Sequence, residues 1–200
     1  MTAREAILAA LRAGRREEAA PRYALPPWPG DTIAQFAARA RATAAEVHEI
    51  AQVHDAPEAI WSILVEKNAA RHVHVPRNSA VNELPWQRAP GLTVKSERPS
   101  GSDSAVSFAD YAIAETGTLV FFSGERSSSS WHFLPGWEFV VLRRHLIVPR
   151  LEDVIASLAR EEGIPATVNL VTGPSRTADI EQTIERGAHG PRELCILIAG

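Results

Sequence analysis

Cysteine is almost absent from this sequence, which has one cysteine among its 200 residues. A single cysteine cannot form an internal disulfide, and it cannot supply the several thiolates that a metal cluster requires. Cys195 lies within the apolar run Leu194–Ala199, so we interpret it as a small buried residue of the core. We therefore expect this chain to carry no cofactor of its own.

Long apolar runs and an excess of positive charge are also lacking. No segment approaches the roughly 18 uninterrupted apolar residues of a membrane-spanning helix, and Arg4 and Glu5 interrupt any signal-peptide pattern. The net charge of −3 gives no general basic surface for binding nucleic acid. We expect a cytoplasmic protein with no membrane span and no nucleic-acid partner.

Histidines with the spacing of a metal site are not obvious either. His72 and His74 alternate in a predicted strand, 71–76, so their side chains share a face. A pair of this kind can bind a metal ion, but no third ligand stands at a suggestive spacing. We interpret both as ordinary core or surface histidines and predict no metal site.

The length corresponds to one α/β domain preceded by an arm. Thr2 and Glu5 form a capping box that predicts a helix ending near Arg15. Residues 16–30 are rich in proline, which prevents regular structure. The sequence is therefore divided into an N-terminal helix and Pro-rich arm, residues 1–30, and an α/β domain, residues 31–200.

Hydrophobic periodicity predicts alternating helices and strands after the arm. The predicted helices span 31–52, a segment that starts at Asp55, 151–160 and 177–186. The predicted strands are 71–76, 92–96, 108–115, 118–123, 139–142, 146–148, 168–171 and 194–199. This alternation indicates a single α/β domain with a mixed, largely parallel sheet flanked by helices.

The segment Thr172–Glu181 is the first candidate for a binding site. It follows the predicted strand 168–171 and leads into the predicted helix 177–186. The free N–H groups of a helix N-terminus bind anions, and an arginine there adds a forked donor. The expected ligand-binding residues are Gly173, Ser175, Arg176, Thr177 and Asp179. The alternative is an ordinary turn followed by an ordinary helix cap.

The segment Glu115-Thr116-Gly117-Thr118 is the second candidate, because a carboxylate stands here between two strongly apolar strands. A buried carboxylate is costly unless it is paired or used in chemistry. We predict Glu115 as a catalytic acid in the same cleft as Arg176, with Thr116, Gly117 and Thr118 contacting the ligand. The alternative is a turn in which Glu115 is solvated.

Two histidines are weaker candidates for the site. His132 lies in the aromatic segment Trp131–Trp137, which either lines a pocket or partner interface or packs its own aromatic rings. His189 lies in the loop 187–191. If the strands around the predicted helix 177–186 are parallel, that loop is about 15 Å from Arg176, at the opposite sheet edge.

Several of these segments, taken in order, resemble the LUD-domain proteins and in particular the lactate utilisation protein C family. The matching segments are 109–120, Leu134-Pro135, Ile147-Val148-Pro149, 172–181 and 189–194. Together they place the resemblance over roughly residues 30–200, and the ordered set is far more specific than any one of them.

The resemblance implies a mixed α/β fold similar to the CoA-transferase and 5-formyltetrahydrofolate cyclo-ligase group. It also implies a bacterial role in oxidising L-lactate to pyruvate, together with two partner proteins that carry iron–sulfur clusters. This chain would bind a small anionic ligand. It departs from the family pattern at Glu138 and Cys195, where histidines are expected or common.

Two other classes of function remain open at this point. The chain would then be a stand-alone acyl-CoA- or nucleotide-dependent enzyme, or a protein that binds a small carboxylate without turnover. Turnover by the isolated chain would indicate the first class, and carboxylate binding without partners would indicate the second.

Overall fold

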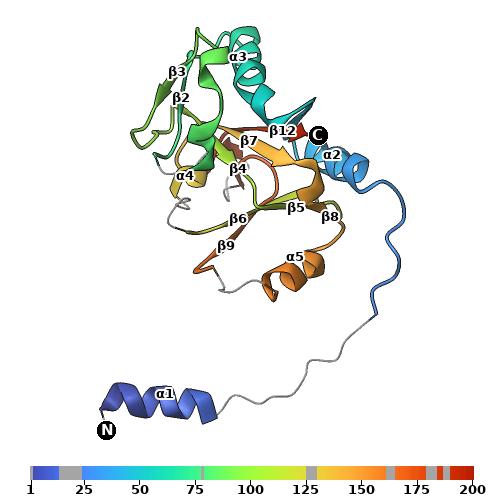
Figure 1. Ribbon diagram of the computed structural model, residues 1–200, viewed down its shortest axis with the longest axis vertical. Coiled ribbons are helices and arrows are strands. Elements are labelled where there is room, and N and C mark those ends of the chain that lie inside the picture. The colour runs from blue at the N-terminus through green and yellow to red at the C-terminus, as the bar shows by residue number, and fades with distance from the viewer. Residues whose placement is uncertain are drawn as a thin grey trace.

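A six-stranded parallel sheet forms the centre of the computed structural model (Figure 1). The strand order is β1-β12-β7-β4-β2-β3, and every neighbouring pair is parallel. The strands are β1 (Glu46–Ile50), β2 (His72–His74), β3 (Thr93–Lys95), β4 (Ser104–Phe108), β7 (Trp137–Arg143) and β12 (Glu193–Ala199). The structure describes residues 2–13, 24–77, 79–124, 130–160, 165–178, 184–186 and 190–200.

A second sheet of four strands combines parallel and antiparallel pairing. Its order is β8-β5-β6-β9, in which β5 is parallel to β8 and antiparallel to β6. The strands are β5 (Tyr111–Ile113), β6 (Thr118–Phe122), β8 (Ile147–Val148) and β9 (Val168–Val171). The predicted strand 108–115 is therefore two strands in two sheets, because the chain crosses from β4 to β5 within it.

Helices cover both faces of the main sheet. The helices are α1 (Ala3–Ala13), α2 (Thr32–Ala42), α3 (Ala56–Glu66), α4 (Ser130–Phe133) and α5 (Leu151–Leu158). Figure 1 shows α3 on one side of the main sheet, with α2 and the four-stranded sheet on the other. The predicted fold class, a single α/β domain with a largely parallel sheet flanked by helices, is confirmed. None of the helices in the described ranges has the length and apolar character needed to cross a bilayer.

Alternate residues of the central strands supply two separate apolar layers. In β7, Val140 packs into the layer that contains α2 and the four-stranded sheet, whereas Phe139 packs into the layer under α3. In β12, Ile196 and Cys195 divide in the same way. Both faces are buried, which explains why these strands are nearly continuous apolar runs in the sequence.

The N-terminal helix begins with the predicted capping box. The Thr2 N–H donates to Glu5 Oε2 at 2.7 Å, and the Glu5 N–H donates to Thr2 Oγ1 at 3.3 Å. Ile7 and Leu8, on the apolar stripe of this helix, are 61% and 40% exposed. The helix is therefore formed by local interactions, and its apolar stripe is not covered by the α/β domain.

The predicted helix 31–52 is wrong in its second half. The helix ends at Ala42, and residues 46–50 form the strand β1. Ala45 N–H donates to the Ala40 carbonyl and Ala44 N–H to the Arg41 carbonyl, which is a Schellman ending with Ala44 at φ 68°. Glycine usually occupies this left-handed position, so its absence hid the end of the helix.

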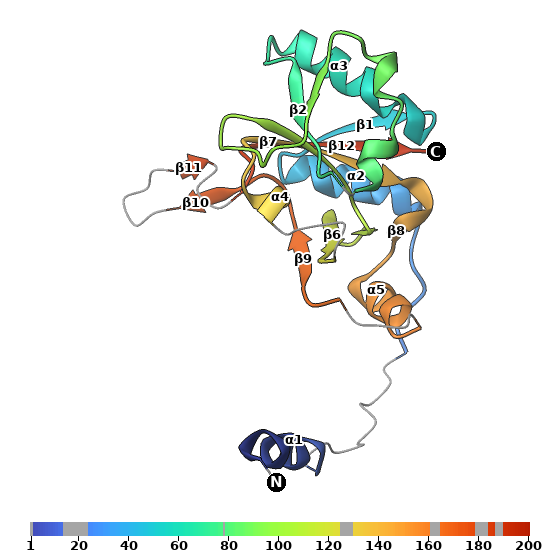
Figure 2. The ribbon, with the colours of Figure 1, turned by 60° about the vertical axis from the view of Figure 1, so that its left-hand side comes forward.

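The predicted helix 177–186 is also wrong. Residues 176–178 form β10 and residues 184–186 form β11, and the two strands pair in antiparallel register, Arg176 with Arg186. Figure 2 shows this pair projecting from the body of the domain. Thr177 and Ile184 are β-branched residues, which favour strands over helices. Asp179 lies outside the described residues.

Candidate functional site

A buried carboxylate, imidazole and hydroxyl meet between the two sheets. Glu138 is 0% exposed and His132 is 2% exposed. Glu138 Oε1 accepts one hydrogen bond from Ser107 Oγ at 2.7 Å and lies 2.7 Å from His132 Nδ1. The carboxylate oxygen therefore fixes the orientation of the imidazole ring, as carboxylates do for functional histidines.

Strand register explains why these side chains meet. Glu138 in β7 is the register partner of Ala105 in β4, and Ser107 follows Ala105 by two positions, on the same face. That face is directed toward the four-stranded sheet. His132, in α4, stacks on Phe121 of β6 with ring centroids 3.9 Å apart and planes inclined by 28°. Each of the two sheets thus holds one side of the cluster.

His132 lines two cavities. The smaller has a volume of about 140 Å³ and is also lined by Ser107 and Trp131. The larger is an open cleft of about 540 Å³, within the usual size of small-molecule sites. Its lining residues are Thr43, His132, Phe133, Leu170, Val171, Thr172, Gly173, Pro174, Ser175, Arg176, Gly190 and Pro191. The predicted site residues Gly173, Ser175 and Arg176 therefore share this cleft with His132.

The loop that precedes β12 also reaches this cleft. The Ser175 N–H donates to the Pro191 carbonyl at 2.8 Å, and Gly190 packs against the Ser175 side chain. A separation of about 15 Å from Arg176 is expected only if the strands around a helix 177–186 are parallel. The strands β9 and β12 belong to different sheets, and Gly190 and Pro191 lie beside Ser175. His189 itself lies outside the described residues.

A chain of threonine hydroxyls joins the two predicted motifs. Thr116 Oγ1 lies 2.7 Å from Thr118 Oγ1, which lies 2.7 Å from Thr172 Oγ1. The pairing of β6 with β9 brings these residues together, since Leu119 is the register partner of Val171. The two motifs are therefore neighbours in the fold, although residues 115–118 are not among those that line the cleft.

The glycines of both motifs pack against the end of α2. Gly117 has φ +71°, and a Cβ there would lie 2.5 Å from the Ala40 nitrogen. Gly173 has φ +82°, and a Cβ there would lie 2.6 Å from the Thr43 carbonyl oxygen. Both positions require glycine for a close approach of two backbones. This packing accounts for both glycines without a ligand, and their contact with a ligand stays a prediction.

Glu115 is exposed, so its predicted burial is wrong. Ile113 and Thr118 are register partners in a tight hairpin, and Glu115 lies in the turn between them. The Glu115 N–H donates to the Pro149 carbonyl at 3.0 Å, which leaves the side chain at the surface. The cavities beside His132 are lined by other residues. The apolar flanks of this segment reflect the buried strands, not the turn. A catalytic role for Glu115 stays a prediction.

Sequence reasoning included His132 but missed Ser107 and Glu138 as its partners. The signal for Glu138 was a charged residue directly before the apolar run Phe139–Leu142, at the start of a central strand. Cys195, by contrast, is fully buried as predicted, and its desolvation raises the pKa of the thiol well above the ordinary value.

Comparison with known proteins gives one family for most of the chain. The sequence model of the LUD domain matches residues 33–199. Lactate utilization protein C from Halalkalibacterium halodurans is 35% identical over 106 residues, which are 51% of this chain and 46% of that protein. Its counterpart from Bacillus pumilus is 38% identical over 99 residues, 47% of this chain and 41% of that protein. The matched segments thus span less than half the length of these curated relatives.

A solved structure has the same fold. The crystal structure of a DUF162 family protein from Deinococcus radiodurans aligns with a TM-score of 0.61, over 84% of this chain and 96% of that one. The sequences are 21% identical in this alignment, so the similarity shows a common arrangement of helices and strands and nothing about function.

Proposed function

This chain belongs to the LUD domain family, and we propose that it is a subunit of a bacterial L-lactate utilisation system. It would act with two iron–sulfur partner proteins in the oxidation of L-lactate to pyruvate. The relatives named lactate utilization protein C support this proposal, at 35% and 38% identity over the matched segments.

The observation that carries the ligand assignment is the cleft shared by Arg176 and His132. A guanidinium group is suited to hold a carboxylate through two parallel hydrogen bonds. His132, whose ring is oriented by Glu138, offers a group that can exchange a proton with a neighbouring hydroxyl. A small hydroxy acid such as L-lactate carries both groups. We therefore assign the cleft to a small carboxylate.

In this proposal the cleft handles the substrate and its protons, and the partner proteins handle the electrons. Oxidation of L-lactate to pyruvate releases two electrons and two protons. A histidine side chain can transfer a proton and an arginine side chain can bind a carboxylate, but neither accepts electrons. The sole cysteine, Cys195, is buried and cannot by itself hold an iron–sulfur cluster. The electrons would therefore pass to clusters in the partner proteins.

Glu138 acts in this proposal through His132. Its side chain is fully buried and lines neither of the two cavities described above. A carboxylate in that position orients the imidazole, but it is poorly placed to attack an acyl group directly. This placement favours a proton-handling site over a stand-alone acyl-CoA-dependent enzyme.

Growth and binding measurements test the proposal separately. In a bacterial strain that lacks its own gene of this family, the chain should restore growth on L-lactate and co-purify with iron–sulfur proteins. Arg176→Ala should weaken L-lactate binding by about 1.5–3 kcal/mol, the scale of a hydrogen bond to a charged group. Arg144→Ala is the matched control, since Arg144 pairs with Glu49 on the surface.

The two parts of the proposal fail in different ways. If Arg176→Ala binds L-lactate as tightly as the unchanged chain, the cleft assignment is wrong. If the unchanged chain binds L-lactate but neither restores growth nor captures iron–sulfur proteins, the subunit role is wrong, and the chain is a carboxylate-binding protein. Turnover of CoA thioesters or nucleotides by the isolated chain would also contradict the subunit role.

A further inference from the structure

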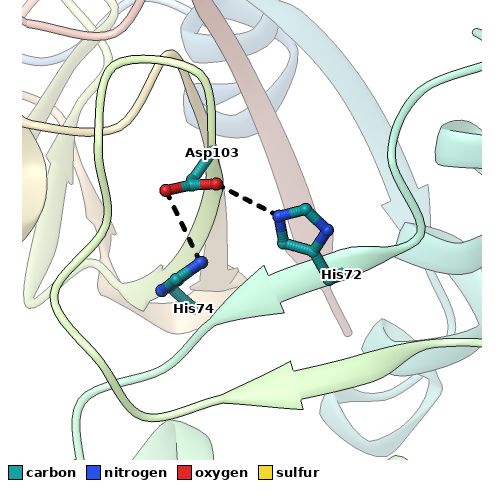
Figure 3. A group of neighbouring side chains, drawn as sticks. All are labelled: His72, His74 and Asp103. Atoms are coloured by element: carbon teal, nitrogen blue, oxygen red, sulfur yellow. Dashed lines mark hydrogen bonds and ion pairs between the residues drawn. The ribbon is translucent and has the colours of Figure 1, made fainter.

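Two histidines and an aspartate converge at the start of β4, apart from the cleft (Figure 3). His72 Nε2 lies 3.1 Å from Asp103 Oδ1, and His74 Nε2 lies 3.7 Å from Asp103 Oδ2. One ligand atom from each residue lies within 4.8 Å of the others. Asp103 is the third group that the sequence did not reveal, because it is 29 residues beyond His74 and meets it only through the pairing of β2 with β4.

The hydrogen bonding of His74 determines which of its nitrogens is available. His74 Nδ1 lies 2.8 Å from the Glu97 carbonyl oxygen, which can only accept a hydrogen bond. Nδ1 therefore carries a proton, and in the neutral ring Nε2 has a lone pair. His74 is 5% exposed, and its Nε2 is buried without a hydrogen-bond partner among the described residues. This lone pair is directed toward a carboxylate oxygen that lies beyond hydrogen-bond distance.

Hydrogen bonds from Ser100 fix the orientation of the Asp103 carboxylate. The Ser100 hydroxyl donates to Asp103 Oδ2 at 2.7 Å and the Ser100 N–H donates to the same oxygen at 2.8 Å. His72 Nε2 lies 3.1 Å from the other carboxylate oxygen, Oδ1. The carboxylate is thus fixed in orientation by its neighbours, as metal-binding carboxylates are.

We propose that His72, His74 and Asp103 bind one divalent transition-metal ion of the type that accepts imidazole and carboxylate ligands, such as Zn²⁺. Zinc bonds of about 2.0–2.2 Å place neighbouring ligand atoms roughly 3.3–3.6 Å apart in a tetrahedral site. His72 and His74 lie 3.1 and 3.7 Å from different oxygens of the Asp103 carboxylate, and one ligand atom from each residue lies within 4.8 Å of the others. The three side chains would therefore draw closer together on binding the ion. A positive ion between Nε2 of His74 and Oδ2 of Asp103 would satisfy the buried imidazole nitrogen, which has no hydrogen-bond partner among the described residues.

The exposure of the ligands defines the rest of the coordination. The side chains of His72 and Asp103 keep 24% and 21% of their surface, so water can reach the cluster from their side. A solvent molecule would complete the fourth position of the ion.

The site belongs to the same face of the main sheet as Glu138. His74 is the register partner of Ala105, and Ala105 is the register partner of Glu138. Two strand spacings separate His74 from Glu138, about 10 Å. The ion would tie β2 to the segment between β3 and β4. This inference does not depend on the lactate proposal, because different residues form the cleft.

Zinc titration of the purified full chain tests the inference. After dialysis against EDTA, isothermal titration with Zn²⁺ should give one site per chain. Co²⁺ should give the visible absorption bands of a tetrahedral nitrogen–oxygen site. His74→Asn keeps a donor for the Glu97 carbonyl and removes Nε2, so it should weaken Zn²⁺ binding at least about 100-fold. Zn²⁺ should also raise the unfolding temperature of the unchanged chain but not that of this variant.

A matched control is available at the surface. His54 Nε2 lies 3.4 Å from Asp55 Oδ1, and the His54 side chain is 52% exposed, so His54→Ala should leave the zinc site intact. If His74→Asn does not fold, Asp103→Asn serves instead, because it keeps the shape of the ligand and removes its charge. Absence of Zn²⁺ binding by the unchanged chain, or equal binding by the control and ligand variants, would overturn the proposal.

Discussion

Glu138 and His132 form a buried pair in which a single carboxylate oxygen, Oε1, lies 2.7 Å from the imidazole Nδ1. The other carboxylate oxygen, Oε2, has no hydrogen-bond partner among the described residues. The contacts with Ser107 and His132 therefore offset the cost of burying this carboxylate in the core. Substitutions of Glu138 should therefore show how much of the stability depends on the charge of its side chain and how much on its shape.

Glu138→Ala should destabilise the protein by about 3–5 kcal/mol, because it leaves a buried polar partner and a cavity. Glu138→Gln keeps the shape and an acceptor for His132, so its loss should be at most about half as large. Urea unfolding at pH 7 measures both values. Equal losses for the two variants would show that the negative charge itself stabilises the core.

Growth on L-lactate should distinguish Glu138 from Glu115. The sequence placed the catalytic carboxylate at Glu115, whereas the structure places a buried carboxylate at Glu138, next to the cleft histidine. Under the proposed function, Glu138→Gln should abolish complementation on L-lactate, and Glu115→Gln should leave thermal stability nearly unchanged because its side chain is exposed. Loss of growth from Glu115→Gln would support the predicted catalytic role of Glu115.

Alanine at Gly117 or Gly173 should destabilise the fold by more than about 1–2 kcal/mol each. Both residues have a positive φ, which costs about that amount for other residues, and both would bring a Cβ against the backbone of α2. Gly124→Ala is the control, since nothing lies within 4 Å of a Cβ there. Thermal unfolding of the three variants tests this, and a similar melting temperature for all three would contradict it.

Cys195 should not react with thiol reagents in the native protein. The side chain is fully buried, and burial raises the pKa of the thiol, so the reactive thiolate is scarce at neutral pH. Labelling with DTNB should reach one equivalent only in concentrated guanidinium chloride, since the chain has one cysteine. Rapid labelling without denaturant would show that β12 opens in the native state.

The ion pair between Glu46 and Lys67 should give a small, pH-limited stabilisation. Burial acts to raise the pKa of Glu46, but hydrogen bonds from Lys67 and His48 outweigh it, so the pKa lies below the ordinary 4.5. The hydrogen bond to Glu46 raises the pKa of Lys67 above its ordinary 10.5. The stabilisation by this ion pair should be fully present between pH 4.5 and pH 10.5, the ordinary pKa values of the two groups. It should be lost as the pH falls through the lowered pKa of Glu46 or rises through the raised pKa of Lys67.

The two side chains are 45% and 35% exposed, so solvent screens the pair and its value should be about 0.2–1 kcal/mol. A double-mutant cycle with Lys67→Met and Glu46→Gln at pH 7, repeated at pH 3 and in concentrated salt, measures it. A coupling free energy that stays the same at pH 3 would contradict the assignment.

Apolar runs and local caps made most of the fold predictable. The run Leu194–Ala199 falls within β12, and Thr2 and Glu5 form the expected capping box. The helix 31–52 extended too far because Val47 and Ile50 continue a helical spacing, although β1 is fixed by its pairing with β12. The spacing of the apolar residues is compatible with a helix and with a strand, and the pairing of β1 with β12 decides for the strand.

The candidate site was harder to predict because its contacts are not local. His132 and Glu138 are six residues apart but lie in different elements, α4 and β7, and Ser107 comes from a third. Asp103 and His74 meet only because β4 lies beside β2. The order of the strands in the sheet determines which of these side chains come into contact, and the order of parallel strands is difficult to predict from a single sequence.

The last turn of α2 receives two glycine turns from separate parts of the chain, at Ala40 and at Thr43. A helix turns by about 100° per residue, so an insertion or deletion within α2 would rotate both contact points away together. Gly117 directly precedes Thr118, whose hydroxyl belongs to the hydroxyl chain, and Gly173 lies in the wall of the cleft. The length of α2 therefore determines the positions of both the hydroxyl chain and the cleft wall. Insertions and deletions during evolution should be confined to segments outside this helix.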